Sequence, residues 1–208
     1  LSRFASKTAE EIETALIKLE NQGMKQLILD LRGNTGGFLR QAVEVVGKFI
    51  HGSKLVVYTM GKDEDNRDEY YTDDFGRSLR RDYPLVILIN ENSASASEIV
   101  AGAIQDYDRG LIAGTNSFGK GLVQNEFILN DGSRIRLTVS KYYTPSGRLI
   151  QRPYKGKGRT EYYHEPDSMN HDSLRMGPLF KTRAGREVFG GGGIEPDTTI
   201  ESESIVVD

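Results

Sequence analysis

The chain has 208 residues, enough to bury one sizeable core, and its 27 Lys and Arg nearly balance its 30 acidic side chains. This balance gives no basic footprint for nucleic acid or an anionic membrane surface, so we expect no nucleic-acid partner. The absence of cysteine excludes disulfides, cysteine-based zinc sites and thiol nucleophiles, and no apolar run is long enough to cross a bilayer, so the chain as given is expected to be soluble.

The N-terminal part opens with a helical pattern. Apolar residues recur at helical spacing over 8–22, with Thr8 as the predicted cap and Gly23 as the stop. A short apolar run at Leu27–Leu31 then predicts a strand that leads through the glycine-rich turn Gly33–Gly37. The elements expected after this turn are a helix at Leu39–Ile50, a strand at Leu55–Tyr58 and a charged solvated loop or short hairpin at Gly61–Asp82.

The strand–turn–helix pattern recurs further along the chain. A buried-strand pattern at Pro84–Asn90 runs through a small-residue turn into a helix from about Ala96 to Tyr107. Three more strands follow, at Leu111–Thr115, Leu122–Leu129 and Arg134–Tyr143, and the last two flank a turn as a β-hairpin. Repeated βα units followed by a hairpin predict an α/β core with a mixed sheet.

The C-terminal part changes character. Residues 151–193 show little periodicity, and we interpret them as an irregular insertion within a single domain that spans residues 1–208. The chain then closes with Ile194–Asp197 and a strand-like tail.

A serine-rich segment lies between a predicted buried strand and a helix. Ser93, Ser95 and Ser97 alternate with alanines, and Glu98 follows them. A hydroxyl at such a turn faces the free amides and positive end of the helix, which suit both a nucleophile and an oxyanion. Serine before a helix is also an ordinary N-cap, so the segment alone leaves both roles open.

A nucleophilic serine needs a base, and the sequence offers two kinds. His51 ends a predicted helix, while His164 and His171 lie in the insertion, so a Ser-His-Asp triad requires the insertion to fold back over the serine. A lysine amine in a dry pocket can also accept a proton. Lys120 lies between two glycines at the end of a strand, and Gln124 could accept a hydrogen bond from its amine. From position alone, a solvated loop lysine remains the alternative.

Two glycine-containing segments have competing interpretations. Gly33–Gly37 is either a plain strand-to-helix turn or a place where a backbone amide meets a developing oxyanion. Gly114–Gly121 matches the first seven positions of a phosphate-binding P-loop. It has Gly121 where magnesium binding needs Ser or Thr, and a predicted strand follows it instead of a helix. The sequence therefore argues against a P-loop-like nucleotide-binding protein.

Five ordered segments resemble the carboxyl-terminal processing proteases, which are serine peptidases of family S41 with a Ser-Lys dyad. The matching segments cover nearly the whole chain and are Leu29–Gly37, Ser93–Ala103, Ser117–Gln124, Lys141–Arg148 and Gly193–Asp197.

The resemblance assigns roles to particular residues. It implies Ser95 as the nucleophile, Lys120 as the base and Gln124 as the residue that supports the lysine. The family's oxyanion amides fall on Gly37 and Ala96, with Gly36 as the second choice for the first of them. The resemblance further implies a crotonase/ClpP-like core of repeated ββα units with an added β-hairpin, and acyl transfer that needs no metal or cofactor.

The chain departs from the family pattern in two respects. Family members carry a PDZ domain before the first helix, and nothing here resembles it, so we expect a catalytic domain without its N-terminal region and PDZ domain. The 151–193 insertion is also longer than the pattern requires.

The resemblance also sets expectations about partners and place of action. Expected partners are protein or peptide substrates cut near their C-termini, and a homo-oligomer is compatible with the sequence. The full-length protein is expected outside the cytoplasm, in the periplasm or associated with a membrane. A non-catalytic scaffold of the same fold is the remaining alternative, and the presence of Ser95, Lys120 and Gln124 argues against it.

Overall fold

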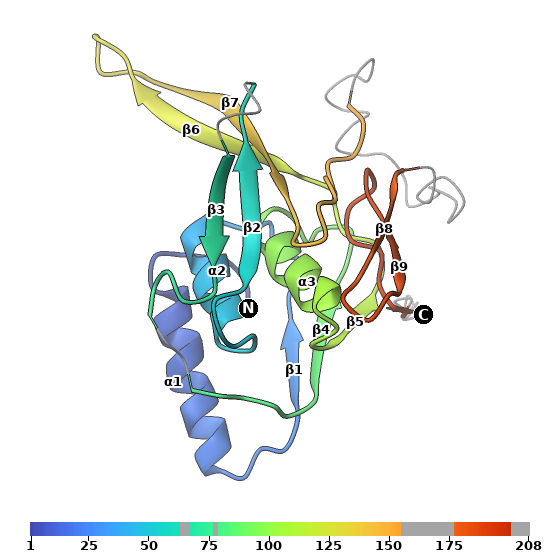
Figure 1. The fold of residues 1–208 in the computed structure, drawn as a ribbon. Coiled ribbons are helices and arrows are strands. Elements are labelled where there is room, and N and C mark those ends of the chain that lie inside the picture. Colours follow the sequence, from blue (N-terminus) through green and yellow to red (C-terminus); the bar gives the residue numbers. More distant parts are fainter. Residues whose placement is uncertain (63–66, 77–78, 155–176, 201–208) are drawn as a thin grey trace, which may run out of the picture.

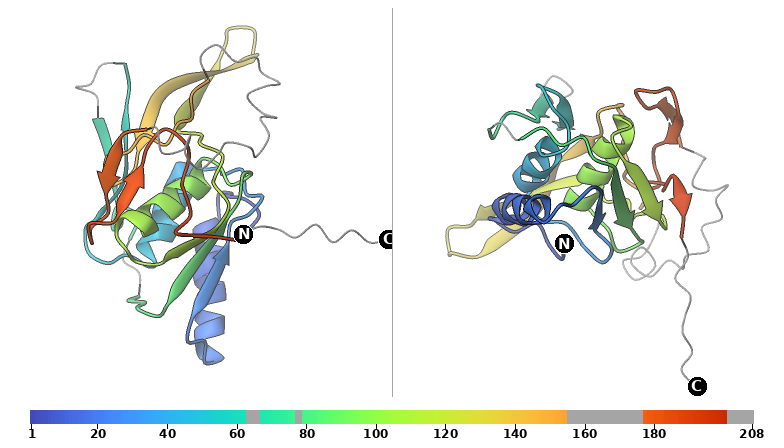
Figure 2. Two further views of the ribbon diagram at one scale, coloured as in Figure 1. Left: turned by 90° about the vertical axis from the view of Figure 1, so that its right-hand side faces the viewer. Right: turned by 90° about the horizontal axis from the view of Figure 1, so that it is seen from below.

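The computed structural model describes residues 1–62, 67–76, 79–154 and 177–200. Helices and two separate four-stranded sheets make up the body, and two neighbouring strands of one of these sheets project from it as a ribbon (Figures 1 and 2). The helices are α1 (Thr8–Asn21), α2 (Leu39–Gly47) and α3 (Ala96–Asp106).

One sheet is entirely parallel, with the strand order β1-β4-β5-β10. Its strands are β1 (Leu27–Asp30), β4 (Leu85–Ile89), β5 (Leu111–Gly114) and β10 (Thr198–Thr199). Leu27 lies opposite Leu85, and Val86 lies opposite Leu111. The chain segments that follow β1, β4 and β5 therefore leave the sheet at the same edge.

The other sheet is antiparallel, with the order β3-β2-β7-β6. Its strands are β2 (Leu55–Met60), β3 (Arg67–Tyr71), β6 (Leu122–Ile128) and β7 (Arg134–Tyr143). The predicted hairpin is confirmed as the projecting β6–β7 ribbon (Figure 1). The prediction of one mixed sheet is wrong, because the parallel and antiparallel strands separate into two sheets.

Helix α3 is the centre of the core. It contacts β5 of the parallel sheet and β2 of the antiparallel sheet, and it packs against α2. Every residue of α3 is buried, and its acidic and amide side chains, Glu98, Gln105 and Asp106, are all hydrogen-bonded. The nucleophile predicted at the start of this helix is thus attached to a fully buried element of the core.

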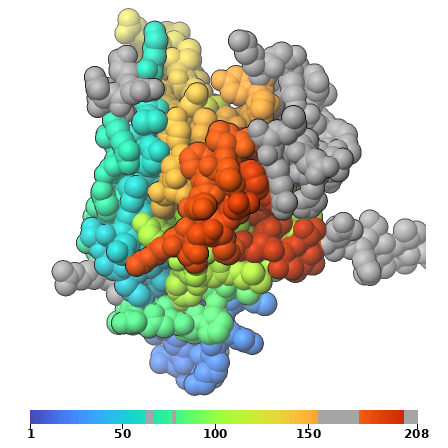
Figure 3. Space-filling view, turned by 45° about the vertical axis from the view of Figure 1, so that its right-hand side comes forward, coloured from blue at the N-terminus to red at the C-terminus, as the bar shows by residue number. Residues whose placement is uncertain are grey.

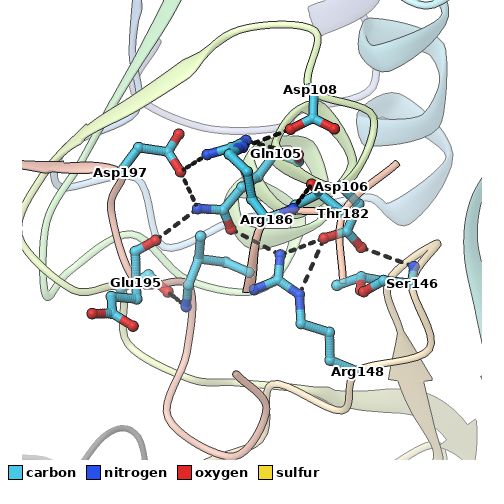
Figure 4. A network of polar contacts seen from close by, with 12 residues as sticks. Gln105, Asp106, Asp108, Ser146, Arg148, Thr182, Arg186, Glu195 and Asp197 are labelled. Atoms are coloured by element: carbon cyan, nitrogen blue, oxygen red, sulfur yellow. Dashed lines mark hydrogen bonds and ion pairs between the residues drawn. The ribbon is translucent and has the colours of Figure 1, made fainter. Parts of the chain in front are cut away.

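The C-terminal end of α3 is held by a network of charged and polar side chains (Figure 4). Arg148 is fully buried and binds the Asp106 carboxylate at 2.6 Å, while Arg186 binds Asp197 at 2.5 Å. Gln105 of α3 donates to the Asp197 carboxylate at 2.9 Å. The network joins the closing segment of the chain to the central helix.

Part of the predicted insertion is a regular hairpin. Strands β8 (Leu179–Lys181) and β9 (Glu187–Phe189) pair antiparallel, so the prediction of an irregular segment is wrong for these residues. Residues 177–200 lie over the end of α3 and beside β5, as the orange to red surface in Figure 3 shows. Residues 155–176 of the insertion lie outside the described part of the chain.

Two local predictions in the N-terminal part are corrected in detail. Helix α1 has Lys7 as its N-cap, and Thr8 is its first residue, with the Thr8 hydroxyl accepting from the Ala5 amide instead of capping. In the charged 61–82 stretch the predicted short hairpin is confirmed, because β3 pairs antiparallel with β2. The stretch is not solvated throughout, because Arg81 is buried and its guanidinium binds Glu13 and Glu20 of α1. Within the described residues, no helix has the length and apolar character needed to cross a membrane.

Candidate active site

Three turns meet at the carboxyl edge of the parallel sheet. The glycine-rich turn follows β1, the serine turn follows β4, and the loop that carries Lys120 follows β5. Because β4 lies between β1 and β5, the serine turn has the other two as neighbours. The strand order thus brings together segments that lie far apart in the sequence.

Ser95 has a strained backbone. It is the N-cap of α3 with φ 56° and ψ −113°, a conformation that residues other than glycine rarely adopt. The neighbouring serines are buried and bond to the main chain, because Ser93 Oγ donates to the Leu31 carbonyl and Ser97 Oγ donates to the Asn34 carbonyl, both at 2.8 Å. Ser93 and Ser97 therefore act as turn residues, whereas Ser95 is partly exposed.

The glycine-rich turn packs directly on the serine turn. A Cβ on Gly36 would lie 2.8 Å from Ser95 Cβ and 2.9 Å from the Ala96 amide nitrogen, and the Gly36 φ of +99° disfavours any other residue. A Cβ on Gly37 would overlap the carbonyl oxygen of Phe4. Glycine is therefore required here for close approach of two backbones.

The amides of Gly37 and Ala96 are the two predicted oxyanion donors. Among the residues that the structure describes, neither amide has a hydrogen-bond acceptor. Ala96 is the first residue of α3, where the helix has no internal acceptor for its amide. Free amides next to Ser95 are what an oxyanion requires.

Glu98 connects the serine turn to the lysine loop. Its carboxylate is fully buried and accepts four hydrogen bonds, from the Ser95 amide at 2.7 Å, the Lys120 amide at 2.9 Å, the Gly119 amide at 2.6 Å and the Ser117 hydroxyl at 2.6 Å. The Ser95 and Lys120 amides bind the same oxygen, Oε2. The main chains of the two predicted dyad residues are thus held within reach of one carboxylate oxygen.

The electrostatics of this carboxylate follow from opposing effects. Burial raises the pKa of Glu98, while the hydrogen bonds from Ser117 and from the amides of Lys120, Gly119 and Ser95 favour the charged form and work against the rise. The carboxylate also lies in the first turn of α3, where the helix dipole favours negative charge.

The lysine loop is also fixed by the closing segment of the chain. Ser117 Oγ, which donates to Glu98, accepts a hydrogen bond from the Ile194 amide at 2.6 Å. The Ser117 amide donates to the Ile194 carbonyl at 3.1 Å, and the Arg152 amide donates to the Gly119 carbonyl at 3.0 Å. The predicted closing segment, Ile194–Asp197, therefore contacts and fixes the loop that carries Lys120.

The predicted site residues are not all equally close. Ser95, Lys120, Gly37 and Ala96 come together at one edge, but within the described residues no hydrogen bond joins the side chains of Ser95 and Lys120. Gln124 lies exposed on β6 opposite Thr138 and makes no hydrogen bond to Lys120 among those residues. Catalytic contacts are often loose without substrate, so these roles stay predictions.

The alternatives considered from the sequence can be placed as well. His51 Nε2 accepts from the Arg81 amide at 3.0 Å, so this histidine has a structural partner. His164 and His171 lie outside the described residues. Strand β6 follows the P-loop-like segment, which confirms that no helix is present to complete a nucleotide site. In the described part of the chain, no cluster of three or more His, Asp or Glu side chains could hold a metal ion.

Comparison with known proteins decides the family. The model of peptidase family S41 matches residues 1–157. The chain belongs to peptidase family S41. This S41 chain is 40% identical over 159 residues to a protein of Staphylococcus epidermidis named as a probable CtpA-like serine protease, covering 76% of the chain and 31% of the relative. It is 42% identical over 152 residues to the carboxyl-terminal-processing protease of Synechocystis sp., covering 73% of the chain and 34% of the relative.

Solved structures agree with this assignment. The photosystem II D1 C-terminal processing protease matches with a TM-score of 0.67 and 32% identity, covering 97% of this chain and 41% of that one. A putative S41 protease from Bacteroides fragilis matches with a TM-score of 0.60 and 16% identity, over 92% of this chain and 41% of its own, which shows the shared α/β fold alone. The S41 chain spans about a third of the length of the curated relatives it matches.

Sequence reasoning missed residues that hold the site together. Glu98 stands three positions after Ser95, and this Ser-x-x-Glu spacing is the signature of a capping box, which could have indicated a bond back to the Ser95 amide. Nothing in the sequence separates Tyr142 from the tyrosine that follows it, yet Tyr142 is buried and its hydroxyl contacts the main chain of Ser95 and of Lys120.

Proposed function

We propose that this chain is the catalytic domain of a serine endopeptidase that cuts proteins near their C-termini. Ser95 is the nucleophile, Lys120 is the general base, and Gln124 supports the lysine when substrate is bound. The amides of Gly37 and Ala96 hold the oxyanion. The observation that carries this proposal is the single Glu98 oxygen that binds the amides of both Ser95 and Lys120, beside two amides that have no acceptor among the described residues.

The proposed chemistry is acyl transfer in two steps. Lys120 takes the proton of Ser95 Oγ as the oxygen attacks the peptide carbonyl carbon, and the Gly37 and Ala96 amides stabilise the tetrahedral oxyanion. Lys120 then protonates the leaving amine, and the C–N bond breaks to give an ester on Ser95. Lys120 next takes a proton from water, the resulting hydroxide attacks the ester, and Ser95 Oγ leaves with the proton. Neither step calls for a metal or cofactor.

Other properties of the whole protein are proposed on the same basis. Relatives of this family are named as carboxyl-terminal-processing proteases, which supports protein or peptide substrates. We further infer action outside the cytoplasm, a PDZ domain in the full-length protein and a crotonase-like core of repeated ββα units. The family assignment and the free amides favour catalysis over a non-catalytic scaffold.

Turnover of casein tests the proposed dyad. We expect cleavage by the unmodified chain to be lost in Ser95→Ala and in Lys120→Ala. Ser53→Ala and Lys25→Ala are matched controls, because both side chains are exposed and lie outside the site, and they should cleave at the unmodified rate. Cleavage that persists in Ser95→Ala would overturn the assignment of the nucleophile, and cleavage that persists in Lys120→Ala would overturn that of the base.

A further inference from the structure

We propose that Tyr142 is a positioning residue of the active site, which fixes the Ser95–Ala96 peptide group and the Lys120 main chain through its phenol hydroxyl. This inference rests on the proposed function, because it assigns Tyr142 a task in that reaction. Tyr142 belongs to β7, at the base of the projecting ribbon, and its side chain is buried. Its hydroxyl lies 2.5 Å from the Lys120 carbonyl oxygen and 3.1 Å from the Ser95 carbonyl oxygen.

The contact with Ser95 bears directly on the oxyanion amide. The carbonyl of Ser95 and the amide of Ala96 belong to the same planar peptide group, so a donor on that oxygen fixes the direction of the Ala96 N–H. It also polarises the peptide, because hydrogen bonds in a chain strengthen one another in a low-dielectric interior. Through the longer branch of this shared hydrogen bond, Tyr142 orients one of the two proposed oxyanion donors.

The second oxyanion amide has the same kind of support. The carbonyl of Gly36, which shares its peptide group with the Gly37 amide, accepts a hydrogen bond from the Phe4 amide at 3.0 Å. Each proposed oxyanion peptide is therefore held from its carbonyl side by a donor outside the turn. In the Gly37 case the donor is main chain, and in the Ala96 case it is the side chain of Tyr142, which mutation can remove.

The contact with Lys120 complements the one made by Glu98. Glu98 Oε2 accepts from the amides of Ser95 and Lys120, whereas the single hydroxyl proton of Tyr142 is shared between the carbonyls of the same two residues, with the shorter contact to Lys120. The two dyad residues are thus bridged twice, once through their amides and once through their carbonyls. This double bridge limits the relative movement of the serine turn and the lysine loop.

The ionisation of Tyr142 suits a permanent donor. Burial raises the pKa of Tyr142 well above its ordinary value, and the nearby Glu98 carboxylate raises it further. The phenol therefore keeps its proton over the whole pH range in which a peptidase works.

The test removes the hydroxyl and keeps the ring. For Tyr142→Phe we expect kcat on casein to fall by between about ten-fold and a hundred-fold, with KM within about two-fold of the unmodified chain. The substitution disturbs the alignment of the reacting groups but leaves substrate binding intact. Tyr143→Phe is the matched control. Tyr143 is the next residue of β7, and its ring stacks on that of Tyr58 at 4.9 Å, a contact that phenylalanine retains, so its kinetics should not change.

Further outcomes separate positioning from general stability. An unchanged kcat in Tyr142→Phe, or equal losses in Tyr142→Phe and Tyr143→Phe, would overturn the inference. If the phenylalanine variant does not fold, 4-fluorophenylalanine placed at position 142 fills the space of the phenol without a donor hydrogen, and full activity of that protein would also overturn it. Failure of the proposed function can be told apart from failure of this inference, because it would appear as casein cleavage by Ser95→Ala.

Discussion

Replacing Glu98 by glutamine tests whether one buried carboxylate organises the site. The carboxylate accepts bonds on both oxygens, with Ser117 and Gly119 on Oε1, and Ser95 and Lys120 on Oε2. Glutamine has a single oxygen, and its NH₂ group must face the donors on the other side. With the amide oxygen at the Oε2 position, the Gly119 amide loses its acceptor. In the reverse orientation both the Ser95 and the Lys120 amides lose theirs.

The expected cost follows from these lost bonds. A buried donor without a partner costs about 1–3 kcal/mol, so one or two such amides cost about 1–6 kcal/mol. Removing a charge from a fully buried position recovers part of this loss. We therefore expect the free energy of unfolding of Glu98→Gln to fall by about 1–4 kcal/mol, a large share of the 5–15 kcal/mol that is typical of a domain.

Urea unfolding followed by circular dichroism measures this change, and the rate of fluorophosphonate labelling of the folded protein measures its effect on the site. Glu187→Gln is the matched control, because Glu187 is exposed on β9, and its stability and labelling should stay as in the unmodified chain. A Glu98→Gln protein as stable as the unmodified chain, with the same labelling rate, would refute the reasoning that the charged carboxylate holds the two turns.

Three further predictions concern the same region and the N-terminal helix. Because Ser95 has φ 56°, Ser95→Gly should unfold at a higher urea concentration than Ser95→Ala, by about 1 kcal/mol or more in free energy, and equal midpoints would contradict a strained turn. In Gly36→Ala the new Cβ would lie 2.7 Å from the Ala94 carbonyl oxygen, at a backbone φ of +99°. This variant should lose fluorophosphonate labelling and melt at a lower temperature. An unchanged melting temperature would contradict the close packing of the two turns. Burial works to raise the pKa of Glu13, but hydrogen bonds and charge attraction from Arg81 and Lys48 outweigh it and lower this pKa. The contribution of Glu13 to stability is therefore complete above its unfolded pKa of about 4.3, and it is lost as the pH falls through the lowered folded value. Glu13→Gln should therefore flatten the stability–pH curve below about pH 4, and an unchanged curve would count against the ion pairs.

Local patterns in the sequence predicted the elements well, because each pattern has a local physical cause. Helical and strand periodicity located the three helices and the ribbon, and the serine turn before α3 was expected from the Ser-Ala alternation. The glycine-rich turn after β1 was expected from its composition, and the structure supplies the reason for it, the contact of Gly36 with Ser95 and Ala96.

The arrangement of these elements could not be predicted locally. Strand order decides that the serine turn has the glycine turn and the lysine loop as neighbours, and no residue of β1, β4 or β5 encodes that order by itself. The same holds for Arg81, which looks like a surface charge in a polar stretch and is buried only because α1 brings Glu13 and Glu20 to it. Tyr142 gains its role from a contact across the fold, between β7 and the start of α3.

The most direct test of the central claim is the site of covalent labelling by a fluorophosphonate, mapped by mass spectrometry of the digested protein. In this reaction the activated serine oxygen forms a bond to phosphorus and fluoride leaves. The account predicts a single adduct on Ser95, formed at a rate that falls sharply in Lys120→Ala. An adduct on another serine, or labelling of Ser95 at the same rate without the Lys120 amine, would contradict it.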